Sequence, residues 1–156
     1  MDTSLIDTIW QQLRRIDGLH SECSSRLETG WNGRGRGRVD VKQTNAHTLI
    51  FNEQGHWNGN AGMQLPFRNV YRWCLGNDRI ALSHLRFGAD QPVFLVDLVA
   101  VKDHLYAAKP HSCGKDCYDA KLSVQDRALL LEWTVTGPAK DEYLRYTYRS
   151  LDHSTA

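Results

Sequence analysis

The stretch of sequence that decides the fold is His111-Ser-Cys-Gly-Lys-Asp-Cys-Tyr-Asp-Ala-Lys-Leu-Ser-Val124. Every other residue of its second half is apolar: Tyr118, Ala120, Leu122 and Val124. A period of two is typical of a β-strand that buries one of its faces. The stretch therefore predicts a strand whose apolar face, beginning at Tyr118, points into the protein interior.

From Leu19 onward, the chain shows the same strand pattern both before and after this stretch. Short runs rich in Val, Ile, Leu, Thr and aromatic residues alternate with Gly, Asn, Asp and Pro. The connections are short enough for consecutive strands to be antiparallel neighbours. The runs predict strands at His20–Glu28, Gly33–Lys42, His47–Gln54, Met63–Leu75, Arg79–Phe87, Val93–Val101, Cys117–Val124, Leu129–Thr136 and Glu142–Ser150.

Residues 1–18 show a helical period instead. Their apolar side chains recur at spacings of three and four, which predicts one amphipathic helix that Gly18 can end. These side chains are Leu5, Ile6, Ile9, Trp10, Leu13 and Ile16. The apolar face of this helix needs a cover, and an open end of a β-barrel would supply it.

Together these elements predict an all-β protein with one N-terminal helix. We expect a single domain over residues 1–156, an antiparallel up-and-down β-barrel of about 8–9 strands. Residues 1–18 would close one end, residues 19–150 would form the barrel, and residues 151–156 would be a tail. Closure of a barrel removes the strand edges that a long meander would expose.

The composition argues against several kinds of partner. The chain carries 19 Lys and Arg against 18 Asp and Glu, so no global field attracts nucleic acid or an anionic membrane. Met1–Trp10 has neither a basic start nor a continuous apolar run, so we expect a cytoplasmic protein with reduced cysteines. We expect no cofactor, and the sequence leaves the oligomeric state open.

Gly33–Val39 reads Gly-Arg-Gly-Arg-Gly-Arg-Val and is similar to Arg/Gly-rich RNA-binding segments. In a strand, however, the glycines and the arginines occupy opposite faces. A face of glycines allows a sharp bend or a close approach by another part of the chain. We therefore expect a bent barrel strand with arginines in solvent, and the alternative is an inward arginine row that binds an anionic ligand.

His111, Cys113 and Cys117 have side chains that can bind zinc. Structural zinc sites combine two cysteine pairs, or one cysteine pair with two histidines, and the sequence contains no second pair. Cys113 could be a nucleophile assisted by His111. The two residues are two positions apart on a strand, however, and this spacing by itself does not supply an attack geometry. We therefore expect no metal site here.

The same residues form part of a longer pattern, which is His-x-Cys-x-x-Asp-x-Tyr, a strand with Trp, Gly-Pro-x-Lys-Asp and a strand rich in Tyr and Arg. The matching positions are His111, Cys113, Asp116, Tyr118, Trp133, Gly137, Pro138, Lys140, Asp141, Tyr148 and Arg149. On these residues the chain resembles a domain family of unknown function with a lipocalin-like (calycin-like) barrel. It departs from the pattern at Ala139, where a basic residue is expected, and at Glu142. The resemblance implies a barrel and a set of positions, without a reaction.

We expect the barrel to bind a small apolar ligand that bears a carboxylate or another anionic group. The predicted ligand-binding residues are His111, Cys113, Asp116, Tyr118, Trp133, Arg86, Arg145 and Tyr146. Two alternatives stay open. One is an enzyme that uses His111 and Asp116 as acid and base in the cavity, and the other is an interaction module with a filled barrel. Alternation alone does not say which face of the last strand points inward.

Overall fold

The computed structural model describes residues 3–27, 32–59 and 62–150, so the predicted tail 151–156 lies outside the described residues. It begins with one helix, α1 (Thr3–Leu13), and continues with antiparallel strands. The strands are β1 (Gly18–Ser25), β2 (Gly33–Asn45), β3 (Thr48–Gly59), β4 (Gln64–Leu75), β5 (Arg79–His84), β6 (Val93–Val101), β7 (His104–Ala107), β8 (His111–Cys113), β9 (Asp116–Gln125), β10 (Ala128–Gly137) and β11 (Lys140–Arg149).

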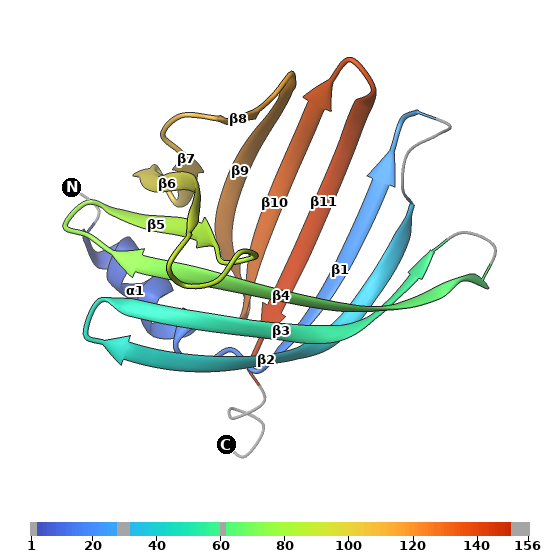
Figure 1. Cartoon of the computed structure of the whole chain (residues 1–156). Coiled ribbons are helices and arrows are strands. Elements are labelled where there is room, and N and C mark those ends of the chain that lie inside the picture. Colours follow the sequence, from blue (N-terminus) through green and yellow to red (C-terminus); the bar gives the residue numbers. More distant parts are fainter. Residues whose placement is uncertain (1–2, 28–31, 60–61, 151–156) are drawn as a thin grey trace.

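The pairing of β9 with β10 closes the sheet into a barrel (Figure 1). Around the barrel the order is β10-β11-β1-β2-β3-β4-β5-β6-β7-β9, and β8 lies outside this ring because it pairs only with β9. The predicted all-β antiparallel barrel with one helix is confirmed. It has ten strands in the ring, slightly more than the 8–9 expected.

The two strands that the sequence did not predict are β7 and β8. They contain 4 and 3 residues, too few for a period of two to stand out from chance. β7 follows β6 through a tight turn in which Lys102 has a φ of 61°. β8 runs beside the first residues of β9, with His111 opposite Tyr118. His111–Cys113 and the start of β9 therefore form a strand pair, which extends beyond the predicted strand Cys117–Val124.

α1 lies at the end of the barrel where the β2–β3 and β4–β5 turns gather (Figure 1). Its apolar stripe is buried against the strands, and Ile9 and Leu13 are fully buried. The helix ends earlier than the predicted boundary at Gly18, because the amide of Asp17 already donates to the carbonyl of Arg149 on β11. No helix in the described residues is long and apolar enough to cross a membrane.

The half of the barrel next to α1 is filled by aromatic side chains. Phe51, Trp73 and Tyr148 are fully buried. The ring centroid of Phe51 lies 5.5 Å from that of Trp73 and 5.6 Å from that of Tyr148. Leu49 and Leu82 complete this packing. The described side chains therefore fill the lumen in the half of the barrel next to the helix.

The glycine face of β2 points inward and its arginines point outward, as the bent-strand interpretation expects. A Cβ at Gly37 would lie 2.4 Å from the carbonyl oxygen of Gln54, and one at Gly35 would lie 3.2 Å from the Trp57 ring. The glycines thus let β3 and inner aromatic rings approach the backbone closely. The exposed side chains of Arg34 and Arg36 do not reach the lumen.

Candidate functional site

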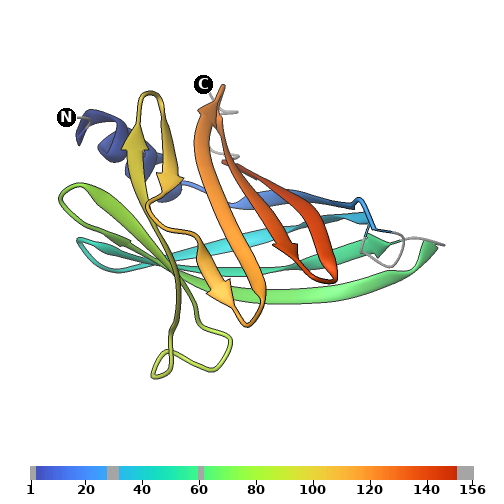
Figure 2. The same ribbon diagram turned by 90° about the horizontal axis from the view of Figure 1, so that it is seen from above.

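A cavity of about 230 Å³ lies inside the barrel at the end opposite α1. Its mouth is bordered by the loop between β5 and β6, which projects away from the side that carries the helix (Figure 2). The lining residues are Tyr71, His84, Arg86, Val93, Leu95, His111, Cys113, Tyr118, Trp133, Val135, Leu144 and Tyr146. The cavity is the part of the lumen that the core leaves open.

Six of the eight predicted ligand-binding residues line this cavity: His111, Cys113, Tyr118, Trp133, Arg86 and Tyr146. They come from β8, β9, β10, β11 and the loop after β5, which the closure of the barrel brings together. The rings of His111 and Tyr118 pack edge to face with centroids 5.9 Å apart, and those of Tyr118 and Trp133 do so at 6.5 Å. These three rings form a continuous aromatic wall.

Asp116 lies near the cavity without lining it. By alternation along β9 its side chain lies on the same face as Tyr118, at the end of the strand. There its carboxylate is 3.6 Å from the Nζ of Lys140, and this ammonium also lies 5.9 Å above the ring of Tyr118. Asp116 and Lys140 therefore form an ion pair on the rim.

The expectation that Arg145 reaches the cavity is corrected by the structure. Its neighbours Leu144 and Tyr146 line the lumen, and Arg145 alternates with them on β11, so it lies on the outer face. On that face it stands opposite Glu22 of β1 and Glu132 of β10. Arg145 thus has a glutamate as its register neighbour on each side of β11.

Tyr71 and His84 also line the cavity, and neither was among the predicted site residues. Their rings stack with centroids 4.8 Å apart and an interplanar angle of 23°. Burial lowers the pKa of His84, and the positive charge of Arg86 lowers it further. The alternation of β4, with Phe67, Tyr71 and Trp73 on one face, is the signal that could have revealed Tyr71.

The electrostatics of the cavity favour negative ligands. Arg86 supplies a permanent positive charge at the exposed mouth, and His84 and His111 supply imidazole groups deeper inside. Among the described residues that line this cavity there is no carboxylate. An anionic group could therefore approach Arg86 without repulsion from the lining.

Glu53 is a buried acid that was not among the predicted site residues. Glu53 of β3 is fully buried, and its Oε2 accepts a hydrogen bond of 2.6 Å from the hydroxyl of Tyr148. Burial raises the pKa of Glu53 to about 8, although the hydrogen bond from Tyr148 acts in the opposite direction. Glu53 shares one face of its strand with Leu49 and Phe51. An acid on an otherwise apolar strand face is the sequence signal that could have revealed it.

A second, smaller hollow of about 140 Å³ lies on the other side of Leu144 and Tyr146, which line both spaces. Its lining also includes Ser21, Glu22, Cys23, Trp57, Phe67 and Asn69. Asn69 stands directly opposite Glu53 in the pairing of β3 with β4. The two hollows therefore flank the region of the lumen that contains the buried acid.

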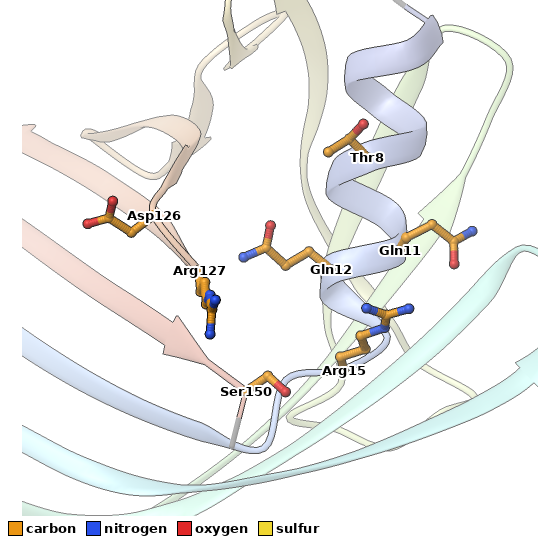
Figure 3. A pocket seen from close by; sticks show the side chains of 7 residues that line it. All are labelled: Thr8, Gln11, Gln12, Arg15, Asp126, Arg127 and Ser150. Carbon is orange, nitrogen blue, oxygen red and sulfur yellow. The ribbon is translucent and has the colours of Figure 1, made fainter. Parts of the chain in front are cut away.

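A larger hollow, about 650 Å³, lies outside the barrel between α1 and the β9–β10 turn (Figure 3). One side consists of helix residues and the other of Asp126, Arg127 and Ser150. Gln12 extends from the helix toward Arg127 across this space (Figure 3). The lining is polar and includes both signs of charge, and it contains none of the predicted site residues.

The cysteines form no disulfide in the described residues, which include all four of them. The same part of the chain contains no group of three or more His, Cys, Asp or Glu side chains that could hold a metal ion. On β8 and β9, Cys113 stands opposite Asp116, whereas Cys117 stands opposite Ser112. Cys113 is exposed beside the cavity mouth.

The fold and the cavity define this molecule as a closed antiparallel β-barrel, plugged by a helix at one end and hollow at the other. Sequence comparison gives its family. Residues 7–150 match a family of unknown function (DUF6314), and the chain belongs to this family. No curated protein and no solved structure matches the chain.

Proposed function

We propose that the protein is a lipocalin-like barrel that binds a small apolar ligand with an anionic group in the cavity opposite α1. The observation that carries this proposal is the lining, which combines aromatic rings with one arginine and two histidines and contains no carboxylate. Ligand sites typically combine mainly apolar surface with a few convergent polar groups.

In this proposal Arg86 and His111 receive the anionic group, since a guanidinium forms strong charge-assisted hydrogen bonds with carboxylates. Tyr118, Trp133 and Tyr146 contact the apolar body of the ligand, and Cys113 contacts it at the mouth. Asp116 acts from the rim through Lys140, whose ammonium lies above Tyr118. A volume of about 230 Å³ suits a compact ring system.

Benzoate is the probe that tests the proposal. Binding should raise the melting temperature and change the intrinsic tryptophan fluorescence, because Trp133 lines the cavity. Arg86→Gln should raise the Kd at least about fivefold, which is roughly 1 kcal/mol of binding free energy. Arg36→Gln, an arginine on the outer face of β2, is the matched control and should leave the Kd unchanged. Equal effects of the two substitutions would contradict the proposed site.

The two alternative functions have less support. An enzyme with His111 and Asp116 as acid and base would need both groups in the cavity, and the Asp116 carboxylate is paired with Lys140 outside it. An interaction module would need a fully packed lumen, and packing is complete only beside α1. We further propose a cytoplasmic location, which agrees with four cysteines that form no disulfide.

A further inference from the structure

One carboxyl group in the lumen has an incomplete set of hydrogen bonds. The Oε2 of Glu53 accepts a bond from Tyr148, but its buried Oε1 has no partner among the described residues. Alternation on β3 places this side chain on the inner face together with Phe51. Buried polar atoms without partners are rare and destabilising, so each one requires a specific explanation.

The protonation state of Glu53 decides whether its unpartnered Oε1 donates or accepts a hydrogen bond. Its titratable neighbours are the phenols of Tyr71, Tyr146 and Tyr148, and burial keeps the carboxyl protonated at pH 7. Because the hydroxyl of Tyr148 donates to Oε2, the proton of the neutral carboxyl resides on Oε1. Oε1 is then an O–H donor that lacks an acceptor.

The position of Glu53 connects this donor with the ligand cavity. Tyr71 and Tyr146 face Glu53 and also line the cavity, whereas Asn69, directly opposite Glu53, lines the smaller hollow. Arg86 also lines the cavity and is exposed, whereas Glu53 is fully buried and does not line it. The cavity thus has a cation, Arg86, at its mouth, and a neutral O–H donor, Glu53, next to two of its lining residues, Tyr71 and Tyr146.

We propose that Glu53 is the inner anchor of the ligand and donates its Oε1 proton to an acceptor oxygen at the buried end of that ligand. The inference rests on the proposed function and names the ligand class more closely. The ligand is a small, flat, apolar acid whose anionic group meets Arg86, and it carries a carbonyl or similar acceptor at the opposite end. Its entry parts the rings of Tyr71 and Tyr146, a side-chain rearrangement common on binding.

A purely structural role explains less of the geometry. The bond from Tyr148 links β11 to β3 across the lumen and uses one oxygen of Glu53. Such a link needs no second oxygen, and a glutamate retained for this purpose alone would leave Oε1 buried without a partner. An acceptor on the ligand satisfies that oxygen.

Two benzoates of nearly the same shape test the proposal. In para-acetylbenzoate the group opposite the carboxylate is a carbonyl, whereas para-isopropylbenzoate has an apolar group of similar size there. The full chain should bind the acetyl compound about tenfold more tightly in calorimetric titrations at pH 7. Glu53→Gln, which keeps an N–H donor at the same position, should keep most of this preference. Glu53→Leu should abolish the preference and still bind the isopropyl compound.

Arg86→Gln is the matched control, because it should weaken both compounds by the same factor and leave their ratio unchanged. If the unmodified protein binds both benzoates equally well, the anchor role of Glu53 is wrong and the proposed cavity function stands. If it binds neither compound, both the anchor and the proposed function are wrong. A preference that persists in Glu53→Leu would also overturn the anchor, since another donor would then be responsible.

Discussion

The hydroxyl of Tyr148 donates a hydrogen bond of 2.6 Å to the carboxyl of Glu53, which lies 95 positions away in the chain. Tyr148 belongs to β11 and Glu53 to β3, and two further strands, β1 and β2, separate these strands in the sheet. The bond therefore crosses the lumen instead of following its wall. It lies at the boundary between the filled half of the barrel and its hollow half.

Glu53 should make the stability of the protein depend on pH. Its pKa is about 8 in the folded protein and has its ordinary value of 4.5 in the unfolded chain. Between these values the folded protein holds a proton that the unfolded chain has released, so a rise in pH favours unfolding. The free energy of unfolding should fall by up to about 1.4 kcal/mol per pH unit from roughly pH 5 to pH 8. Urea denaturation at a series of pH values measures this slope.

Glu53→Gln is the control for the pH experiment, because the amide does not titrate and retains the shape of the side chain. The difference in unfolding free energy between the two proteins should shrink as the pH falls toward 5 and grow as it rises toward 8. The histidines contribute equally to both proteins and cancel in this difference. Parallel pH profiles for the two proteins would show that Glu53 is not protonated when folded.

Gly37→Ala should destabilise the barrel. The added Cβ would lie 2.4 Å from the carbonyl oxygen of Gln54, which belongs to the backbone of β3 and can move only if the strand pair shifts. Overpacking of this kind costs about 1–3 kcal/mol. Gly18→Ala is the matched control in a strand, because its nearest contact would be an ordinary 3.8 Å. Similar urea midpoints for the two variants would contradict this account of the glycine face.

Leu13→Ala should show how strongly α1 holds the closed end of the barrel. Leu13 is fully buried in the core that joins the helix to the strands. Truncation of a buried leucine costs about 2–5 kcal/mol. Gln11→Ala, on the exposed face of the same helix, should cost less than about 0.5 kcal/mol. Thermal unfolding of both variants provides the comparison, and a small effect of Leu13→Ala would mean that the barrel is stable without its plug.

Asp116→Asn should strengthen ligand binding and lower the stability only slightly. The side chains of Asp116 and Lys140 are 26 % and 40 % exposed and their charged atoms are 3.6 Å apart, so the pair contributes about 0–1 kcal/mol to folding. Loss of the carboxylate leaves Lys140 unneutralised near Tyr118, which should strengthen benzoate binding about two- to fivefold at low salt. Asp119→Asn, on the exposed outer face of β9, should have no such effect. Weaker binding by Asp116→Asn would contradict its proposed place on the rim.

Several features of the site could be predicted from single strands. On β9 the alternation placed Tyr118 inward with Ala120 and Leu122, and it does line the cavity. On β11 alternation left the inward face open, so both Arg145 and Tyr146 were expected to reach the ligand, although adjacent residues of a strand lie on opposite faces. Both faces of that strand carry tyrosines, so composition did not distinguish the buried face from the exposed one.

The sequence by itself determined the local structure: an amphipathic helix, a series of strands with a period of two, and the opposite faces of the glycines and arginines in β2. These properties depend on neighbours a few positions apart, so the order of residues specifies them. Only the tertiary structure decided where along the lumen each inward side chain lies. That depth is set by the register between distant strands and by the β9–β10 and β1–β11 pairings that close the ring. Closure therefore filled one half of the barrel, left a cavity in the other, and placed Glu53 between them.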